Sequence, residues 1–174
     1  MTKPPALPAT SPPVPEPEGD SRVPLRLILN GDERDCKVRM HDSLLDLLRR
    51  EGFAGAKRVC ETADCGACSV LLDGMLVDSC ALLALQAGGR RVDTIEGLAG
   101  REGLHPLQDA FLRHAAAQCG FCIPGMILTL CALLDRKPDA SLADIREAVT
   151  LCRCTGYVKP IEAVLDYQRQ LRKS

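Results

Sequence analysis

The distribution of cysteine is the feature that most constrains how this chain can fold. The sequence contains ten cysteines in 174 residues, and eight of them form two groups of four, one in each half. The first group is Cys60, Cys65, Cys68 and Cys80, and the second is Cys119, Cys122, Cys152 and Cys154. Four thiols that converge on one point need either disulfide pairing or a bound metal, so the fold must bring each group together.

The N-terminal sequence argues against a secreted, disulfide-bonded protein. Small cysteine-rich secreted domains are exported behind a signal peptide with an apolar segment. The first 24 residues hold eight of the twelve prolines and no such segment. No apolar run along the chain reaches the roughly 18 residues of a membrane-spanning helix. We therefore expect a cytoplasmic protein without a membrane span, in which thiols stay reduced unless a metal holds them.

Length, charge and the proline-rich segment divide the chain further. A polar, proline-rich stretch cannot bury enough apolar surface to offset its ordering entropy, so residues 1–22 are predicted to be a disordered tail. A chain of 174 residues suits one large or two small domains. Its 22 basic and 23 acidic residues give a net charge of −1 and form no basic patch, which argues against a nucleic-acid partner.

Residues 23–97 are predicted to form a small mixed sheet with one helix. The pairs Asn30-Gly31 and Asp73-Gly74 are strong signals for hairpin turns. A helix is expected from Leu44 to about Gly52, with His41-Asp42-Ser43 supplying its N-cap. Strands are expected at Pro24–Leu29, around Cys36, Val38 and Met40, at Val70–Leu72, at Met75–Val77 and at Arg91–Ile95.

Residues 98–174 are predicted to form four helices joined by short loops, which is the pattern of a helix bundle. Proline suits the first turn of a helix, and a serine followed three residues later by an acidic residue resembles a capping box. The expected helices run from Pro106 towards Ala117, from Gly125 to about Arg136, from Ser141 towards Val149 and from Pro160 to near Lys173.

The spacing of the first cysteine group favours an iron–sulfur cluster over a zinc ion. The pattern is C-x4-C-x2-C-x11-C, and plant-type [2Fe–2S] proteins use C-x4-C-x2-C with a distant fourth cysteine. Gly66 and Ala67 carry small side chains, so backbone N–H groups can approach the sulfurs of a bound cluster. A zinc site would more often show two similar C-x2-C pairs.

The second group is less diagnostic, because C-x2-C-x29-C-x-C is compatible with either zinc or a second cluster. Both of its cysteine pairs are expected at helix ends, where N–H donors and the positive end of the helix dipole favour an anionic group. Neither group contains a Cys-x-His element, which argues against a Rieske centre.

Three runs of sequence resemble the motifs of a known family. They are Cys60-Glu-Thr-Ala-Asp-Cys-Gly-Ala-Cys68, Gln118-Cys-Gly-Phe-Cys-Ile-Pro-Gly125 and Cys152-Arg-Cys-Thr-Gly-Tyr157, with Asp73-Gly74 and Ser79-Cys80 after the first. In this combination they resemble the small iron–sulfur subunit of molybdenum hydroxylases, the xanthine dehydrogenase and aldehyde oxidase family. The resemblance covers roughly residues 24–170, so only the proline-rich tail lies outside it.

The resemblance implies an α+β chain: a β-grasp, plant-ferredoxin-like domain at residues 23–97, then an all-α four-helix-bundle domain at residues 98–174. Each domain would bind one [2Fe–2S] cluster, and Gln118 would contact the pterin of a molybdenum cofactor. That cofactor and FAD would be held by a large and a medium partner subunit of a heterotrimer. Electrons would run from molybdenum through the helical-domain cluster and the β-grasp cluster to FAD. The implied cluster ligands are Cys60, Cys65, Cys68 and Cys80 in the first domain, and Cys119, Cys122, Cys152 and Cys154 in the second.

The sequence departs from the family pattern without losing a ligand. Ala63 and Val59 stand where glycine is usual, Val149-Thr150 where Gly-Asn is common, and Ile123 where threonine or serine is usual. The position of Ala63 matters most, because alanine is strained wherever the backbone needs a positive φ.

The function expected from the resemblance is that of an oxidoreductase subunit that transfers electrons and binds no substrate itself. Two alternatives remain open at this point: a structural zinc-binding interaction module, and a free-standing two-cluster ferredoxin. Among the remaining residues of interest, Cys36 and Cys131 are expected to be buried structural thiols. His41, His105 and His114 are expected to be caps or surface residues.

Overall fold

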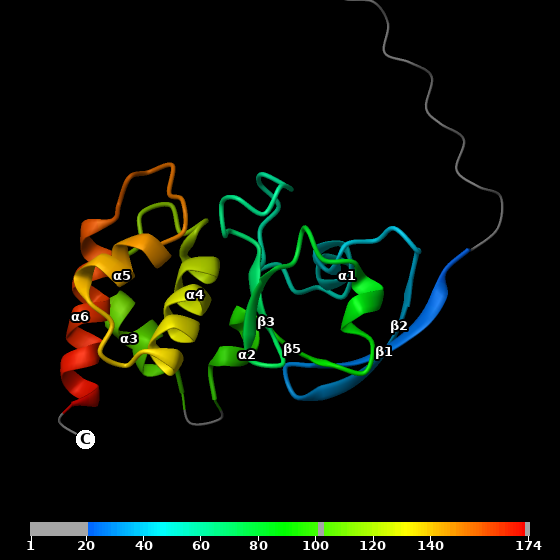
Figure 1. Ribbon diagram of the computed structural model, residues 1–174, viewed down its shortest axis with the longest axis horizontal. Helices are drawn as coiled ribbons and strands as arrows, with labels where there is room; N and C mark the ends of the chain where they lie inside the picture. Colours follow the sequence, from blue (N-terminus) through cyan, green and yellow to red (C-terminus); the bar gives the residue numbers. More distant parts are fainter. Residues whose placement is uncertain (1–20, 101–102, 173–174) are drawn as a thin grey trace, which may run out of the picture.

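The computed structural model describes residues 21–100 and 103–172, so the predicted tail at residues 1–22 lies almost wholly outside the described residues (Figure 1). The chain forms a sheet-containing half followed by a helical half, and the two lie side by side with β3 facing α4 (Figure 1). No helix in the described ranges is long and apolar enough to cross a membrane.

The first half is built on a five-stranded mixed sheet with strand order β2-β1-β5-β3-β4. β1 pairs parallel with β5, and the neighbouring pairs β1–β2, β3–β4 and β3–β5 are antiparallel. Both predicted hairpins are confirmed: Asn30 and Gly31 have φ values of 52° and 90°, and Asp73 and Gly74 have φ values of 50° and 78°. The strands are β1 (Val23–Leu29), β2 (Asp32–Val38), β3 (Ser69–Leu72), β4 (Met75–Asp78) and β5 (Arg91–Asp93).

Helix α1 (Leu44–Arg50) closes the core of the sheet domain. Ser43 and Asp46 form a capping box at its start, in which the Ser43 hydroxyl accepts from the Asp46 amide and the Asp46 carboxylate accepts from the Ser43 amide. All four leucines of the helix, at positions 44, 45, 47 and 48, are fully buried against the sheet. These leucines therefore form part of the core of the sheet domain.

Two details predicted for this half were wrong. β2 ends at Val38 and Met40 is 64 % exposed, because the chain turns where the Asp42 carboxylate accepts from the Arg39 amide. β5 ends at Asp93, two residues before the predicted end at Ile95.

The early end of β5 is caused by a side chain of the β1–β2 turn. The Asn30 side chain accepts from the Thr94 amide at 2.7 Å and donates to the Thr94 hydroxyl at 3.0 Å, which takes Thr94 out of the strand ladder. The chain then enters a short helix, α2 (Ile95–Leu98), which the sequence did not predict. A 3-10 turn, η1 (Ala84–Ala87), was likewise not predicted.

The second half contains the four predicted helices, with shifted ends. The predicted helix from Pro106 stops at Arg113 instead of Ala117, and the helices predicted from Gly125 and Pro160 each begin two residues earlier. Proline is tolerated throughout the first turn, where backbone N–H groups have no partner within the helix. The helices are α3 (Pro106–Arg113), α4 (Ile123–Arg136), α5 (Leu142–Ala148) and α6 (Val158–Leu171).

Helix α4 is the central element of the molecule, and nine of its fourteen residues are buried. It packs against α3 and α5 on the side of the helical core and against β3 and β4 on the side of the sheet. A helix that is apolar nearly all round needs such cover on every side. The two domains therefore share α4 as a common wall.

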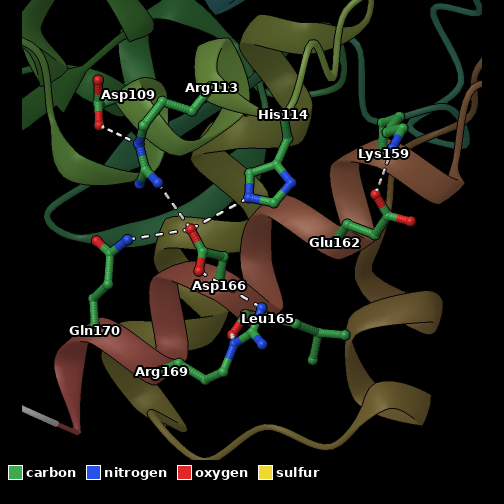
Figure 2. A network of polar contacts seen from close by, with 9 residues as sticks. All are labelled: Asp109, Arg113, His114, Lys159, Glu162, Leu165, Asp166, Arg169 and Gln170. Atoms are coloured by element: carbon green, nitrogen blue, oxygen red, sulfur yellow. Dashed lines mark hydrogen bonds and ion pairs between the residues drawn. The ribbon is translucent and has the colours of Figure 1, made fainter.

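A polar network joins α3 to α6 on the outer side of the bundle (Figure 2). The Asp166 carboxylate accepts from Arg113 at 2.9 Å and contacts His114 Nε2 at 3.2 Å. These hydrogen bonds hold the pKa of Asp166 below its usual value. Because His114 caps the C-terminus of α3, the network fixes the point from which the next cysteine-bearing loop leaves.

Candidate metal centres

The first cysteine group lies on the loop between α1 and β3 and on the turn after β4. Ser69 of β3 pairs with Asp78 of β4. This pairing brings Cys68, next to Ser69, close to Cys80, two residues after Asp78, and their thiols are in contact. The buried Ser79 hydroxyl donates to the Cys68 carbonyl at 2.7 Å and fixes this end of the site.

Cys60 lies at the other end of this site, within a cradle of backbone amides. The N–H groups of Thr62, Asp64 and Cys65 donate to its sulfur and lower the pKa of the Cys60 thiol to about 6. The thiolate is the form that binds metal. At Cys60 the loop therefore already favours the charged form that metal binding requires. Burial has the opposite effect on Cys68 and raises the pKa of its thiol to about 12. The Cys68 thiol therefore needs a bound cation in order to ionise.

Arg58 ties the loop to the body of the domain. Its guanidinium pairs with Asp46 on α1 and with Glu61 inside the loop. Glu61 and Ala63 both have positive φ, 58° and 60°, so the loop is held in a conformation that L-residues rarely adopt. This finding confirms the strain expected at Ala63.

We expect Ala63→Gly to raise the free energy of unfolding by about 0.5–1 kcal/mol. The left-handed conformation costs alanine roughly 1–2 kcal/mol, and the extra freedom of glycine in the unfolded chain offsets roughly 0.5–1 kcal/mol of that gain. Chemical denaturation of the metal-loaded protein measures the change. The matched control is Ala54→Gly in the same loop, where φ is not positive and the same exchange should destabilise. Equal effects at the two positions would contradict the assignment of strain to Ala63.

The second cysteine group lies on two facing loops, one between α3 and α4 and the other between α5 and α6. The thiol of Cys119 contacts that of Cys154, and the thiol of Cys122 contacts that of Cys152. The Tyr157 hydroxyl accepts from the Cys152 amide at 2.8 Å and closes the second loop on itself. Burial raises the pKa of Cys122 to about 12, as it does for Cys68 in the first group.

Gln118, which precedes the second group, packs across the facing loop. A Cβ atom added to Gly156 would lie 2.6 Å from the Gln118 side-chain nitrogen, so the glutamine packs closely over this glycine. The side chain of Gln118 thus lies beside Cys119 and Cys154, on the wall of a small cavity that both cysteines line.

Each set of thiols includes a pair in contact. Cys68 contacts Cys80 in the first set, and Cys119 contacts Cys154 in the second. A [2Fe–2S] cluster takes four cysteine thiolates shared between two irons. The donors present at each site therefore fit such a cluster.

Cysteines of both groups border a single apolar groove of about 540 Å³. Cys60 and Cys65 line it from the first domain, and Cys119, Cys122 and Cys152 line it from the second. The cysteine-bearing loops lie along one edge of the molecule, at the top of Figure 1. Three large apolar side chains stand exposed on this groove: Val59, Phe121 and Leu151.

The two cysteines outside the groups lie in the cores, as expected. Cys36 and Cys131 are each 5 % exposed, and burial raises the pKa of Cys131 to about 12. The histidines also match expectation, since His105 is the N-cap of α3 and accepts from the Leu107 amide. His114 is the C-cap of the same helix, and His41 is exposed.

We expect Cys131→Ala to leave the iron content and the visible spectrum unchanged while lowering thermal stability. Cys131 is packed in the helical core and its sulfur lies 3.9 Å from His105 Nδ1, so truncating it should remove packing and no cluster ligand. Iron analysis beside a thermal melt separates the two effects. A variant that folds but lacks iron would mean that Cys131 is a ligand.

Comparison with known protein families matches each half of the chain to a family of its own. Residues 27–93 match the family described as 2Fe-2S iron-sulfur cluster binding domain, and residues 94–165 match the family described as [2Fe-2S] binding domain. The chain is 42% identical over 158 residues to the nicotine 6-hydroxylase small subunit of Paenarthrobacter nicotinovorans, covering 89% of this chain and 95% of that protein. It is 43% identical over 152 residues to the nicotinate dehydrogenase small FeS subunit of Eubacterium barkeri, covering 84% and 95%.

The chain is also similar to solved structures of this kind. The chain superposes on the crystal structure of quinoline 2-oxidoreductase from Pseudomonas putida 86 with a TM-score of 0.82 and 40% identity, over 88% of this chain and 98% of that chain. The α+β fold and the order of the two domain types expected from the resemblance are confirmed. Neither a zinc module nor a free ferredoxin is favoured by these relatives. The chain belongs to the family of small iron–sulfur subunits of molybdenum hydroxylases.

Proposed function

We propose that this chain carries single electrons from a molybdenum–pterin site on a large partner subunit towards FAD on a medium partner subunit, within a cytoplasmic heterotrimer. The observation that carries the proposal is the pair of four-cysteine sets that meet at one groove, one set in each domain. Nothing else in the described residues forms a comparable set of donors.

The proposed cluster ligands are the eight grouped cysteines. Cys60, Cys65, Cys68 and Cys80 hold one [2Fe–2S] cluster, and Cys119, Cys122, Cys152 and Cys154 hold the other. When bound, such clusters accept and release one electron at a time at potentials set by their surroundings. The proposed domain boundary remains at residues 97 and 98, near the end of α2.

The chain's own part is to hold the thiolates rigidly and to control their surroundings. The amides of Thr62, Asp64 and Cys65 stabilise negative charge on Cys60. Cys68 and Cys122 are kept away from water, at 2 % and 8 % exposed. A rigid, preorganised site changes little in structure when its charge changes by one, which suits repeated electron transfer.

Partner subunits are proposed to cover the apolar edge of the groove. Val59, Phe121 and Leu151 are 55 %, 47 % and 62 % exposed, and isolated small proteins rarely leave such a patch uncovered. Gln118 is proposed to contact the pterin, because its side chain lies beside the second cysteine set. With this contact, the second set would lie nearest to the molybdenum subunit and the first set on the side of the FAD subunit.

The test is a measurement of iron, acid-labile sulfide, zinc and molybdenum per chain, on protein purified gently from its native host. About four iron and four sulfide are expected from two [2Fe–2S] clusters, together with molybdenum, flavin and two larger copurifying chains. Iron without partners would instead support a free ferredoxin. About two zinc without iron would leave a structural thiolate protein and overturn the proposal.

A further inference from the structure

A polar pocket of about 310 Å³ lies between the two domains, separate from the apolar groove. One wall is formed by β3, β4 and the first cysteine loop, and the other by α4, the end of α5 and the segment that leads to Leu151. The Leu151 amide donates to the Cys65 carbonyl at 3.1 Å and joins the two walls. A water molecule takes up about 30 Å³ in the liquid, so the pocket has room for a polyatomic ligand.

Three carboxylates line this pocket. Asp64 and Glu147 are exposed, one on each wall, and Asp78 on β4 is half-buried. Oδ1 of Asp78 accepts from the Ser69 hydroxyl at 3.1 Å. None of the described residues that line the pocket is Lys, Arg or His, so its own lining does not compensate the negative charge.

The Asp78 carboxylate also lies beside a proposed cluster ligand. The Cys68 sulfur is 3.8 Å from Asp78 Oδ1. A cysteine that binds a cluster is a thiolate, so two negative groups then lie in contact and disfavour each other's charge. A cation in the pocket, next to Asp78, would offset this repulsion.

Two buried hydroxyls on the same pocket have no partner. Thr129 on α4 and Thr150 after α5 are 9 % and 6 % exposed, and both line the wall that faces Asp78. Neither hydroxyl oxygen has a hydrogen-bond partner among the described residues. A buried hydroxyl without a partner is costly, so such a group marks a place where a bound molecule completes the hydrogen bonding.

We propose that this pocket binds a guanidinium or primary ammonium group, whose N–H donors pair with Asp78, Glu147 and the two threonine hydroxyls. The inference rests on the proposed function, because the negative charge on Cys68 comes with the cluster. A guanidinium or ammonium group carries several N–H donors and no acceptor, which matches a pocket lined by acceptors. Two sources can supply this group: a basic side chain of a partner subunit, or a free small amine.

The test is a calorimetric titration of the iron-loaded full chain with methylguanidinium chloride. We expect saturable binding at one site per chain. Tetramethylammonium chloride is the matched probe, because it carries the same charge without an N–H donor, and it should bind at least about ten-fold more weakly. Equal affinity for the two probes would overturn the proposal, and so would binding of Mg²⁺ without binding of methylguanidinium.

Variants of the lining locate the binding. Asp78→Asn removes the charge but keeps an acceptor for Ser69, and it should weaken methylguanidinium binding about ten-fold or more with both clusters retained. Thr150→Val replaces the unpartnered hydroxyl with a methyl group, and it should weaken binding without lowering the thermal stability of the unliganded chain. The control is Glu33→Gln, exposed on β2 at the opposite edge of the sheet from β4, which should bind as wild type.

A further variant decides the matter if Asp78→Asn does not fold. Glu147 is exposed, so Glu147→Gln should fold and weaken binding by roughly two- to five-fold. Wild-type affinity in Thr150→Val together with wild-type affinity in either carboxylate variant would overturn the site.

The same titration of the assembled complex identifies the source of the group. Binding to the chain alone, lost in the complex, would identify a basic side chain of a partner subunit, and Asp78→Asn should then also weaken assembly. Binding to both would identify a free amine. A chain with two clusters that binds no methylguanidinium would overturn this inference alone, whereas a wild-type protein without clusters would overturn the proposed function.

Discussion

Cys154→Ser is expected to halve the iron content of the chain, from about four to about two iron per chain, by removing the helical-domain cluster alone. Cys154 contacts Cys119 within the second set, and serine is a poor ligand for an iron–sulfur cluster. The first set has its own loop, its own hairpin and its own core, so it should keep its cluster. Iron analysis with visible and electron paramagnetic resonance spectra of the reduced protein measures the loss.

Two further variants serve as controls for Cys154→Ser. Cys60→Ser should give the mirror result, with loss of the first cluster and survival of the second. Cys36→Ala, which truncates a buried thiol outside both sets, should retain both clusters. If Cys154→Ser kept both spectra unchanged, the assignment of Cys154 as a ligand would be wrong.

Leu130→Ala is expected to lower the free energy of unfolding by about 2–5 kcal/mol. Leu130 is fully buried on α4 and belongs to the helical core cluster. Its truncation leaves a cavity beside α4, the helix that forms the common wall of the two domains. The close-packed neighbouring side chains have little freedom to move into this cavity. Chemical denaturation followed by circular dichroism measures the change on the loaded protein.

Leu112→Ala is the matched control for this truncation. Leu112 lies on α3 in the same domain but is 67 % exposed, so the same chemical change should alter stability by no more than about 0.5 kcal/mol. A similar loss of stability at both positions would mean that burial does not govern the free-energy cost of removing a leucine side chain. A negligible loss at Leu130 would mean that α4 is not packed as the structure shows.

The features that the sequence could predict are those with a local cause. Asn30-Gly31 and Asp73-Gly74 form the expected turns because a type I′ two-residue hairpin needs positive φ at both positions, which Asn, Asp and Gly tolerate. Ser43 and Ser141 start helices with capping boxes because the required partner lies three residues away in each case. The cysteine sets were recognisable because three members of the first and both pairs of the second have characteristic short spacings.

The errors arose where a side chain outside the strand overrode the strand pattern. The strand predicted to reach Ile95 stops at Asp93 because Asn30, far away in sequence, binds the Thr94 backbone. The strand expected around Met40 ends at Val38 because Asp42 turns the chain just after β2. Strand propensity could not reveal either contact, since each depends on a side chain outside the strand.

By itself, the sequence determined the two domain types, their order and the grouping of eight cysteines into two sets, because each depends on spacings within a short stretch of chain. Only the tertiary structure decided how the two sites face each other. Gly125 carries no sign in the sequence that it must lie against Gly66, and Leu151 none that its amide bonds to Cys65. Those contacts join segments far apart along the chain, and they exist because α4 must bury apolar surface against both the sheet and the other helices.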